Sequence, residues 1–464
     1  MNIYKKLFSN SLIFAIGNLG SKLIVILLVP LYTYTLSTTE YGVTDIITTT
    51  SNLVLPLITL SIYEAVLRFT MDKDYDKEKV LTSGFFITLV GNLFLLLMIP
   101  IIKNLTNNDY LVYFYLLLMI QTFQSLLSQY VRAVGKVKEF AINGILNAFL
   151  VGSFNVLFLV KLKYGISGYL LSIIIAGFIS VVYLSVVSEV IKIVKIRKFD
   201  LILSKTLIKY SIPLIPNSFM WWVINTSNRY FIVYFIGMSE NGLFSVANKI
   251  PSILSIFQSI FFQAWQLSAI DEYDSENKDK FYSNVFNFFS AFMIIVTSGI
   301  LLFLRIIIRY ILSPEYYLSW KYVPFLLIGI LFSSFSSFYG TNYIAAKKTS
   351  GVLTSSLLGA AINVFLCYIL IPGFGVNGAS FATMISFLFM WGYRVFDTRK
   401  MISIDVKWKK LFANLLTLFL QIFYLYYGKY TFLNSIFLFM ILLINLKELK
   451  VIYNLIKVKV LARH

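Results

Sequence analysis

The sequence has 464 residues, of which 58% are hydrophobic and 13% are charged. Because soluble domains carry about 25% charged residues, this composition excludes an ordinary soluble protein and predicts a polytopic membrane protein. The formal net charge of +19 fits lysines and arginines that anchor loops on one side of a membrane better than it fits a nucleic-acid-binding surface.

Rare residue types exclude several kinds of chemistry. The one histidine is His464 and the one cysteine is Cys367, so we expect no histidine-based triad, no zinc site and no intramolecular disulfide. The sequence contains no Gly-x-x-x-x-Gly-Lys-Ser/Thr loop for nucleotide phosphates. We therefore expect a protein that is not an enzyme and that needs no cofactor or metal.

Long apolar runs predict an all-α protein with about 14 transmembrane helices, since a helix needs ~20 apolar residues to cross a bilayer. The first run follows Lys5 and Lys6 and lacks a small-residue cleavage site, so it is expected to be an uncleaved span rather than a signal peptide. The expected spans are 11–36, 43–67, 80–102, 110–131, 140–160, 166–188, 210–236, 242–268, 283–304, 322–346, 352–371, 376–394, 411–428 and 430–446.

The basic residues are divided unevenly between alternate loops. With the N-terminus inside, 30 of the 40 lysines and arginines fall in cytoplasmic segments and 7 fall in outside loops. Arg394, at the inner end of the twelfth span, is counted among the cytoplasmic residues. Because basic loops resist translocation, we expect an even number of spans and both termini in the cytoplasm.

Two short motifs recur once each in the second half of the chain. Residues 39–42 (Thr-Glu-Tyr-Gly) match residues 239–242 (Ser-Glu-Asn-Gly), and residues 165–168 (Gly-Ile-Ser-Gly) match residues 375–378 (Gly-Val-Asn-Gly). Each pair lies at equivalent points of a six-span unit. Because six is even, the two halves are expected to insert the same way up, as pseudo-symmetric lobes.

The repeat predicts four segments. They are an N-terminal six-helix lobe at 1–190, a basic cytoplasmic linker at 191–209, a C-terminal six-helix lobe at 210–400, and two extra helices with a basic tail at 401–464. The linker and the tail are expected to lie against anionic lipid headgroups.

Polar side chains recur at helical spacing on three pairs of repeat-related spans: 1 and 7, 2 and 8, and 4 and 10. Because a lipid-facing side should be apolar, such stripes mark inward faces, although they can also hold neighbouring helices together. We favour a hydrated cavity between the lobes. The expected lining residues are Asn18, Asp45, Asn52, Gln121, Ser125, Asn217, Asn225, Asn248, Ser252 and Ser255.

Three cations lie inside predicted spans: Lys22, Arg229 and Lys249. Each costs ~2.5–3.5 kcal/mol if it is isolated near the bilayer centre. Asp45 is a candidate partner for Lys249, whereas Lys22 and Arg229 have no evident partner in the sequence. A structural ion pair or a snorkelling side chain is the alternative, but we expect these cations to bind the diphosphate of a substrate.

Three segments resemble the polysaccharide-export flippases of the multidrug/oligosaccharidyl-lipid/polysaccharide exporter (MOP) superfamily: residues 39–42, 228–249 and 372–379. The resemblance implies two six-helix bundles in a V shape, like those of MATE transporters, that work by alternating access. It implies a cargo of undecaprenyl-diphosphate-linked oligosaccharide, moved to the outer leaflet of a bacterial cytoplasmic membrane for O-antigen, capsule or teichoic acid. The implied partners are this lipid-linked substrate, membrane lipids, and a polymerase and glycosyltransferases of the same pathway.

Three alternatives are weighed against this interpretation. A peptidoglycan-precursor flippase would handle the same diphosphate lipid with the same fold. A cation-coupled drug exporter would need a carboxylate deep in a span, and Asp45 and Glu64 lie near span ends. A membrane glycosyltransferase would be expected to carry a large polar loop, and every loop here is short.

Overall fold

The computed structural model describes Gly20, Ile24 and residues 26–106, 109–346, 350–428 and 433–448. Every regular element in this part of the chain is a helix, which confirms the predicted all-α class. Nine of these helices are long and apolar enough to cross a membrane, or ten if one bent pair is counted as a single span. The number of 14 spans stays a prediction.

The helices pack into two compact units. Unit 1 contains residues 1–233 and 237–245, and unit 2 contains residues 234–236 and 246–464. These units are defined by contacts between residues. The predicted segments are defined by the sequence repeat instead: the lobes at 1–190 and 210–400, the linker at 191–209 and the segment 401–464. The predicted boundaries therefore stay predictions.

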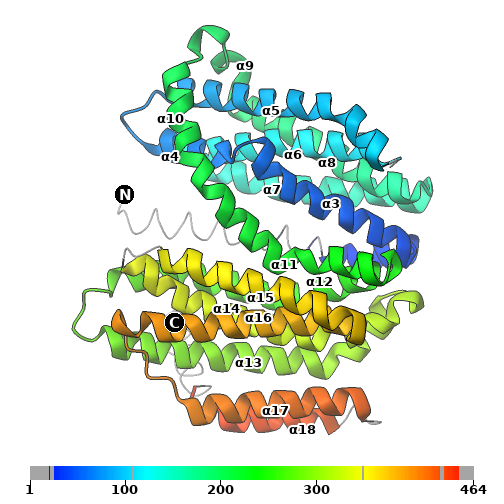
Figure 1. Ribbon diagram of the computed structural model, residues 1–464, viewed down its shortest axis with the longest axis vertical. Coiled ribbons are helices and arrows are strands. Elements are labelled where there is room, and N and C mark those ends of the chain that lie inside the picture. The colour runs from blue at the N-terminus through cyan, green and yellow to red at the C-terminus, as the bar shows by residue number, and fades with distance from the viewer. Residues whose placement is uncertain are drawn as a thin grey trace, which may run out of the picture. The chain divides into compact units, whose positions relative to one another are not determined.

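Helix α6 (Leu111–Ala133) is the central helix of unit 1 and packs against α3, α4, α5, α7 and α8. Figure 1 shows α5, α6, α7 and α8 running side by side, with α10 crossing α4 and α5. The other elements of unit 1 are α2 (Val29–Thr35), α3 (Thr38–Ile58), α4 (Ile62–Met71), α5 (Lys77–Thr106), α7 (Val137–Asn155), the π-helical turn η1 (Val156–Lys161), α8 (Gly165–Val187), α9 (Val190–Ile193), η2 (Ile196–Lys198), α10 (Leu201–Ser211), η3 (Ile212–Leu214), α11 (Ile215–Phe235) and the start of α12 (Met238–Asp271).

Apolar side chains of unit 1 are found both in its core and on its surface. Leu81, Leu126 and Leu184 are fully buried in one core cluster, whereas Val90 and Val112 are 64% and 61% exposed. Large exposed apolar faces are unfavourable in water, so these helix faces are suited to lipid.

The predicted span 43–67 is broken in the structure. Helices α3 and α4 meet at an angle of 57°, where Leu60 and Ser61 adopt left-handed backbone conformations with φ of 50° and 52°. The backbone N–H groups of both residues donate to carbonyls of the preceding turn, on Leu57 and Pro56. The chain therefore changes direction without leaving these two N–H groups unpaired, as a hydrocarbon environment demands.

The second repeated motif forms equivalent turns in the two units. Gly165 begins α8 with φ of 55°, and Gly375 precedes α16 (Val376–Asp397) with φ of 59°. Such positive φ values favour glycine because it lacks a Cβ. Three residues further on, a Cβ on Gly378 would lie 2.4 Å from the Leu370 carbonyl oxygen. The motif is therefore explained by backbone geometry.

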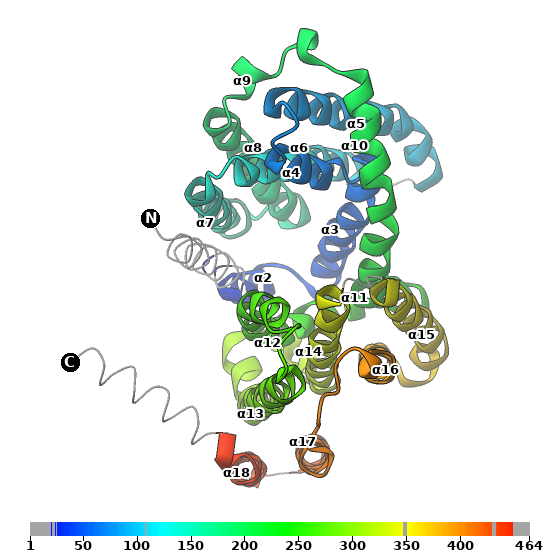
Figure 2. The ribbon, with the colours of Figure 1, turned by 90° about the vertical axis from the view of Figure 1, so that its left-hand side faces the viewer.

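Helix α16 of unit 2 packs against α14 and α15, and α17 and α18 pack on α13. Figure 2 shows α13, α14, α15 and α16 nearly end-on. After α12, the elements of unit 2 are α13 (Lys278–Ile311), η4 (Pro314–Lys321), α14 (Val323–Ala345), α15 (Ser350–Phe374), α16, η5 (Thr398–Lys400), α17 (Trp408–Tyr427) and α18 (Asn434–Ile444).

Arg394 is buried rather than part of a charged surface. Its side chain on α16 is 2% exposed and donates to the Ser355 and Ser356 hydroxyls and to the Ser336 carbonyl. Its place on the cytoplasmic side stays a prediction. Gly340 on α14 allows this burial, because a Cβ there would lie 2.6 Å from Nη1 of the guanidinium.

Candidate functional site

The two copies of the first repeated motif contact each other within unit 1. A Cβ on Gly42 would lie 2.0 Å from the Met238 carbonyl oxygen, and a Cβ on Gly242 would lie 1.9 Å from the Thr38 carbonyl oxygen. The Asn241 amide also donates to the Gly42 carbonyl at 3.0 Å. The first turns of α3 and α12 therefore pack backbone to backbone, which requires glycine at both positions.

Capping hydrogen bonds start helix α3 at this contact. The Ser37 hydroxyl accepts from the Glu40 N–H at 3.3 Å, and the Glu40 carboxylate accepts from the Ser37 N–H at 2.9 Å. This reciprocal pair is a capping box, which satisfies two backbone donors at a helix start. Glu40 of the motif is thus explained by helix capping.

Asp45 lies one turn further along α3 and accepts three hydrogen bonds. Arg229 of α11 donates through Nε to Oδ2 at 2.8 Å, Ser245 of α12 donates to Oδ1 at 2.7 Å, and Asn241 donates to Oδ2 at 3.4 Å. The side chains of Arg229 and Asp45 are 12% and 10% exposed. We call Asp45, Arg229, Asn241 and Ser245 the Asp45 cluster.

The expectation that Arg229 has no protein partner is wrong, because Asp45 neutralises it. The guanidinium also donates through Nη1 to the Asn225 carbonyl at 3.0 Å, and its central carbon lies 5.8 Å from the centre of the Phe244 ring. A guanidinium has five N–H donors in a planar fork, so these contacts leave N–H groups for a further anion. The expected pairing of Asp45 with Lys249 is not tested by these contacts and stays a prediction.

Aromatic side chains on α11 hold it against α3 beside the cluster. The Trp222 indole donates to the Thr49 carbonyl at 3.0 Å, and the Tyr230 hydroxyl shares a hydrogen bond of 2.6 Å with Thr50. The two rings lie 5.4 Å apart. Sequence reasoning missed this group and the roles of Asn241 and Ser245 at Asp45. The offset of 200 between the motif copies was the signal that could have paired residue 45 with residue 245.

The remaining predicted residues lie in several places. Lys22 and Asn18 lie outside the described residues. Asn52 and Asn225 are exposed on α3 and α11, Gln121 and Ser125 are half-buried on α6, and Asn217 lies on α11. Four predicted residues are half-buried on the part of α12 that belongs to unit 2: Asn248, Lys249, Ser252 and Ser255.

Several of these polar groups bond to their own helix. The Asn225 amide donates to the Trp221 carbonyl at 2.8 Å, and the Ser255 hydroxyl donates to the Pro251 carbonyl at 3.5 Å. By contrast, Oε1 of Gln121 is buried with no hydrogen-bond partner in the described structure. Their role in lining a cavity stays a prediction. Among the described residues, no group of three His, Cys, Asp or Glu side chains could hold a metal ion.

The sequence matches a family model and a curated relative. Residues 7–266 match the family described as polysaccharide biosynthesis protein. An uncharacterized membrane protein of Methanocaldococcus jannaschii, MJ1068, is 27% identical over 191 residues, which make up 38% of this chain and 36% of that protein. The match thus spans about a third of the relative's length.

Solved transporters share the fold. The lipid II flippase MurJ in an inward closed conformation has a TM-score of 0.72 at 15% identity, covering 96% of this chain and 99% of that chain. An outward-facing multidrug resistance MATE transporter of the MOP superfamily has a TM-score of 0.62 at 13% identity, covering 86% and 95%. A MOP superfamily transporter from Pyrococcus furiosus has a TM-score of 0.61 at 12% identity, covering 85% and 96%.

The resemblance inferred from the sequence motifs is confirmed at the level of the family. The likeness to the solved transporters, at identities of 12–15%, establishes the fold alone. Because the family model covers more than half of the chain, the protein belongs to the polysaccharide biosynthesis protein family and has the fold of the MOP superfamily transporters.

Proposed function

We propose that this protein moves an undecaprenyl-diphosphate-linked oligosaccharide from the inner to the outer leaflet of the bacterial cytoplasmic membrane, by alternating access. The glycan would serve O-antigen, capsule or teichoic-acid synthesis, downstream of glycosyltransferases and upstream of a polymerase. The observation that carries the proposal is the mostly buried Arg229 guanidinium, whose bonds to Asp45 and to the Asn225 carbonyl leave further N–H groups for an anion.

Arg229 is suited to exchange its anion. A diphosphate carries more negative charge than a carboxylate and accepts paired N–H bonds from a guanidinium. Asp45, once displaced, keeps the Ser245 hydroxyl and the Asn241 amide as donors. These two neutral donors offset part of the ~3–5 kcal/mol that breaking a buried ion pair costs, but they do not neutralise the Asp45 charge. Asp45 therefore holds the place of the substrate phosphate between transport cycles.

Lys22 and Lys249 are proposed to complete the phosphate site. The sugars would contact the polar side chains of the predicted cavity, and the polyprenyl tail would remain in lipid. The chain would act without chemical conversion of its cargo, with both termini on the cytoplasmic side.

A lipid-linked peptidoglycan precursor is the second candidate cargo. The observation that favours it is the fold of MurJ, a protein described as a lipid II flippase, which aligns over 99% of its length. Both cargoes present a diphosphate, so Arg229 has the same role in either case. The sugar part distinguishes them.

The test replaces Arg229 by alanine in a host that lacks its own flippase for surface polysaccharide. We expect surface polymer to be lost and the lipid-linked repeat unit to accumulate on the cytoplasmic side, when both are measured per amount of inserted protein. Arg309→Ala, which removes an exposed arginine at the end of α13, is the matched control and should export normally. Full export by Arg229→Ala at normal abundance would contradict the phosphate role.

A second arm identifies the cargo. The purified protein is placed in vesicles with either a lipid-linked surface-glycan repeat unit or a lipid-linked peptidoglycan precursor, and movement is followed by the fraction accessible to an added enzyme. Faster movement of the first supports the proposal, and movement of the second alone replaces it by the alternative.

A further inference from the structure

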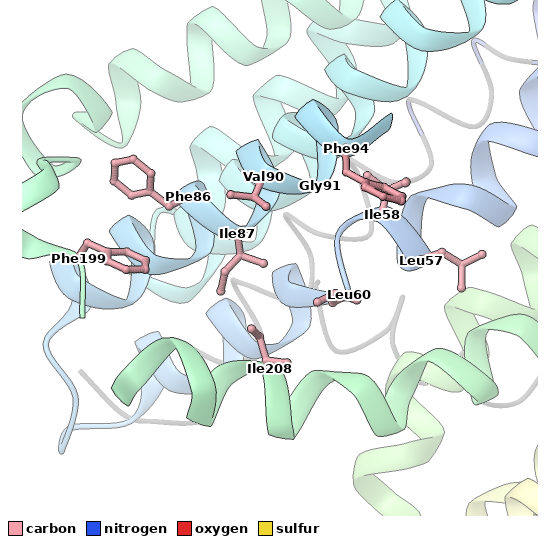
Figure 3. A pocket seen from close by; sticks show the side chains of 10 residues that line it. All are labelled: Leu57, Ile58, Leu60, Phe86, Ile87, Val90, Gly91, Phe94, Phe199 and Ile208. Atoms are coloured by element: carbon pink, nitrogen blue, oxygen red, sulfur yellow. The ribbon is translucent and has the colours of Figure 1, made fainter. Parts of the chain in front are cut away.

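The break between α3 and α4 opens a groove on unit 1. Leu57 and Leu60 form the wall at the break, and Phe86, Val90 and Phe94 form the wall on α5; together they line a cavity of about 550 Å³ (Figure 3). The side chains that line it are all apolar, and Val90 and Phe94 are 64% and 57% exposed.

Close packing of the backbone explains why the groove forms at this place. Gly91 of α5 also lines it, and a Cβ there would lie 2.1 Å from the Ile58 carbonyl oxygen. Helix α5 therefore approaches the end of α3 directly, and α4, which leaves α3 at an angle of 57°, also packs on α5. The groove lies beside this bend.

The basic segment 192–209, which includes most of α10, borders the groove. Phe199 and Ile208 of this segment line the groove, and the Phe199 ring lies 5.5 Å from that of Phe86 (Figure 3). Phe199 directly follows η2, and Ile208 lies on α10. The groove therefore joins an apolar channel to the chain segment that carries Lys192, Lys195, Arg197, Lys198, Lys205 and Lys209.

Some of these cations are already neutralised by the protein. Lys192 pairs with Glu189, and Lys198 pairs with Glu78. Asp200 pairs with Lys79 at 3.6 Å, and the pKa of its carboxyl is lowered, chiefly because the Leu203 N–H donates to it.

In the described part of the chain, Arg197 and Lys205 are exposed and make no ion pair. Arg197 lies two residues before the groove-lining Phe199, and Lys205 lies three residues before the groove-lining Ile208. Exposed positive charge therefore flanks both lining residues in the sequence.

We propose that the groove holds one acyl chain of an anionic glycerophospholipid whose phosphate binds Arg197 and Lys205. Along α5 the groove runs from Phe86 to Phe94, about 12 Å at 1.5 Å per residue, which is most of one leaflet of a hydrocarbon layer ~30 Å thick. An apolar groove ordinarily gives an acyl chain no advantage over the surrounding bilayer, so the choice of lipid is made by charge at the headgroup.

Native mass spectrometry of the purified protein tests this site. The protein is titrated with phosphatidylglycerol or with phosphatidylcholine, and the fraction that retains lipid is measured. We expect phosphatidylglycerol to be retained at least tenfold more tightly than phosphatidylcholine. Val90→Trp and, from the other wall, Leu57→Trp should each weaken this retention about tenfold by filling the groove, and Arg197→Gln should weaken it about fivefold.

Two variants serve as matched controls. Val112→Trp adds the same bulk at an equally exposed position on α6, and Lys161→Gln removes an exposed charge at the end of η1. Both should bind as the unmodified protein does. Equal retention in all variants, or retention of the neutral lipid, would overturn the proposal. Preferential retention of a polyprenyl phosphate that Val90→Trp abolishes would assign the groove to the substrate tail instead.

Discussion

Replacing Asp45 by asparagine tests the idea that this carboxylate holds the place of a substrate anion. The change keeps the shape of the side chain and an acceptor for Ser245, but it removes the charge that faces Arg229. We expect a less stable protein whose Arg229 is more attractive to a diphosphate. The free energy of unfolding should therefore fall while the affinity for a diphosphate rises.

The size of the destabilisation follows from the geometry of the pair. Two unit charges 4 Å apart interact by ~4 kcal/mol at the effective dielectric constant of ~20 that suits sites near a protein surface. Removing one partner of a buried pair costs ~3–5 kcal/mol. Since both side chains are 10–12% exposed, water relieves part of this cost, and we expect the free energy of unfolding to fall by about 3 kcal/mol.

A double-mutant cycle measured by denaturant titration in detergent isolates this coupling. Asp45→Asn with Arg229→Gln removes both charges, so the double variant should recover about 2 kcal/mol relative to the sum of the single losses. The exposed pair Arg68–Asp72 on α4, at 3.5 Å, is the control and should show a coupling below ~0.5 kcal/mol. A coupling as small for Asp45 and Arg229 would refute the claim that they depend on each other.

A diphosphate should restore the stability that Asp45→Asn loses. A short polyprenyl diphosphate that binds only the folded state stabilises it by ~2.7 kcal/mol at a hundred times its dissociation constant. We expect it to stabilise Asp45→Asn more than the unmodified protein, and not to stabilise Arg229→Gln. If all three respond equally, the diphosphate binds elsewhere.

Three further changes test the packing around this site and in unit 2. Gly42→Ala should lower the free energy of unfolding by about 1–3 kcal/mol, because the new Cβ would lie 2.0 Å from the Met238 carbonyl oxygen. Gly299→Ala is the control: a Cβ there has nothing within 4 Å, so this change should be neutral or stabilising in thermal unfolding. Tyr230→Phe should cost about 1 kcal/mol in the same assay, since it deletes the hydrogen bond to Thr50 but keeps the ring. Arg394→Lys should destabilise almost as much as Arg394→Gln, because an ammonium cannot reproduce the planar fork; full stability of the lysine variant would show that charge alone matters there.

The sequence was sufficient for the fold class because its strongest signals are local. Long apolar runs predict membrane helices whatever their partners are, and Gly165 and Gly375 sit where the backbone needs positive φ. The break at Leu60 and Ser61 was not predictable in this way. Neither residue favours a left-handed backbone, so the conformation depends on packing with α5 at Gly91.

The candidate site depends on contacts between residues about 200 positions apart, and charge counting predicted only part of it. A cation inside a predicted span stands out because its burial in a membrane costs free energy, so Arg229 could be selected from the sequence. Its partner could not be selected, because Asp45 was placed near a span end and considered as a partner for Lys249. The burial of Arg394 was likewise not predictable, because its three acceptors lie on α14 and α15, at least 38 positions away in the sequence.

The repeat itself explains why the carboxylate and the guanidinium meet. Residues 38–42 and 238–242 begin equivalent helices, and their glycines allow the two helix starts to touch. One turn later the repeat places Asp45 beside Ser245, so an acid in one copy faces a hydroxyl in the other. Arg229, from the helix before the second copy, then pairs with that acid. Under the proposed function, a substrate that displaces Asp45 would act directly on the contact between the two motif copies. We therefore expect substitutions at Gly42 or Gly242 to impair transport even when Asp45 and Arg229 are intact.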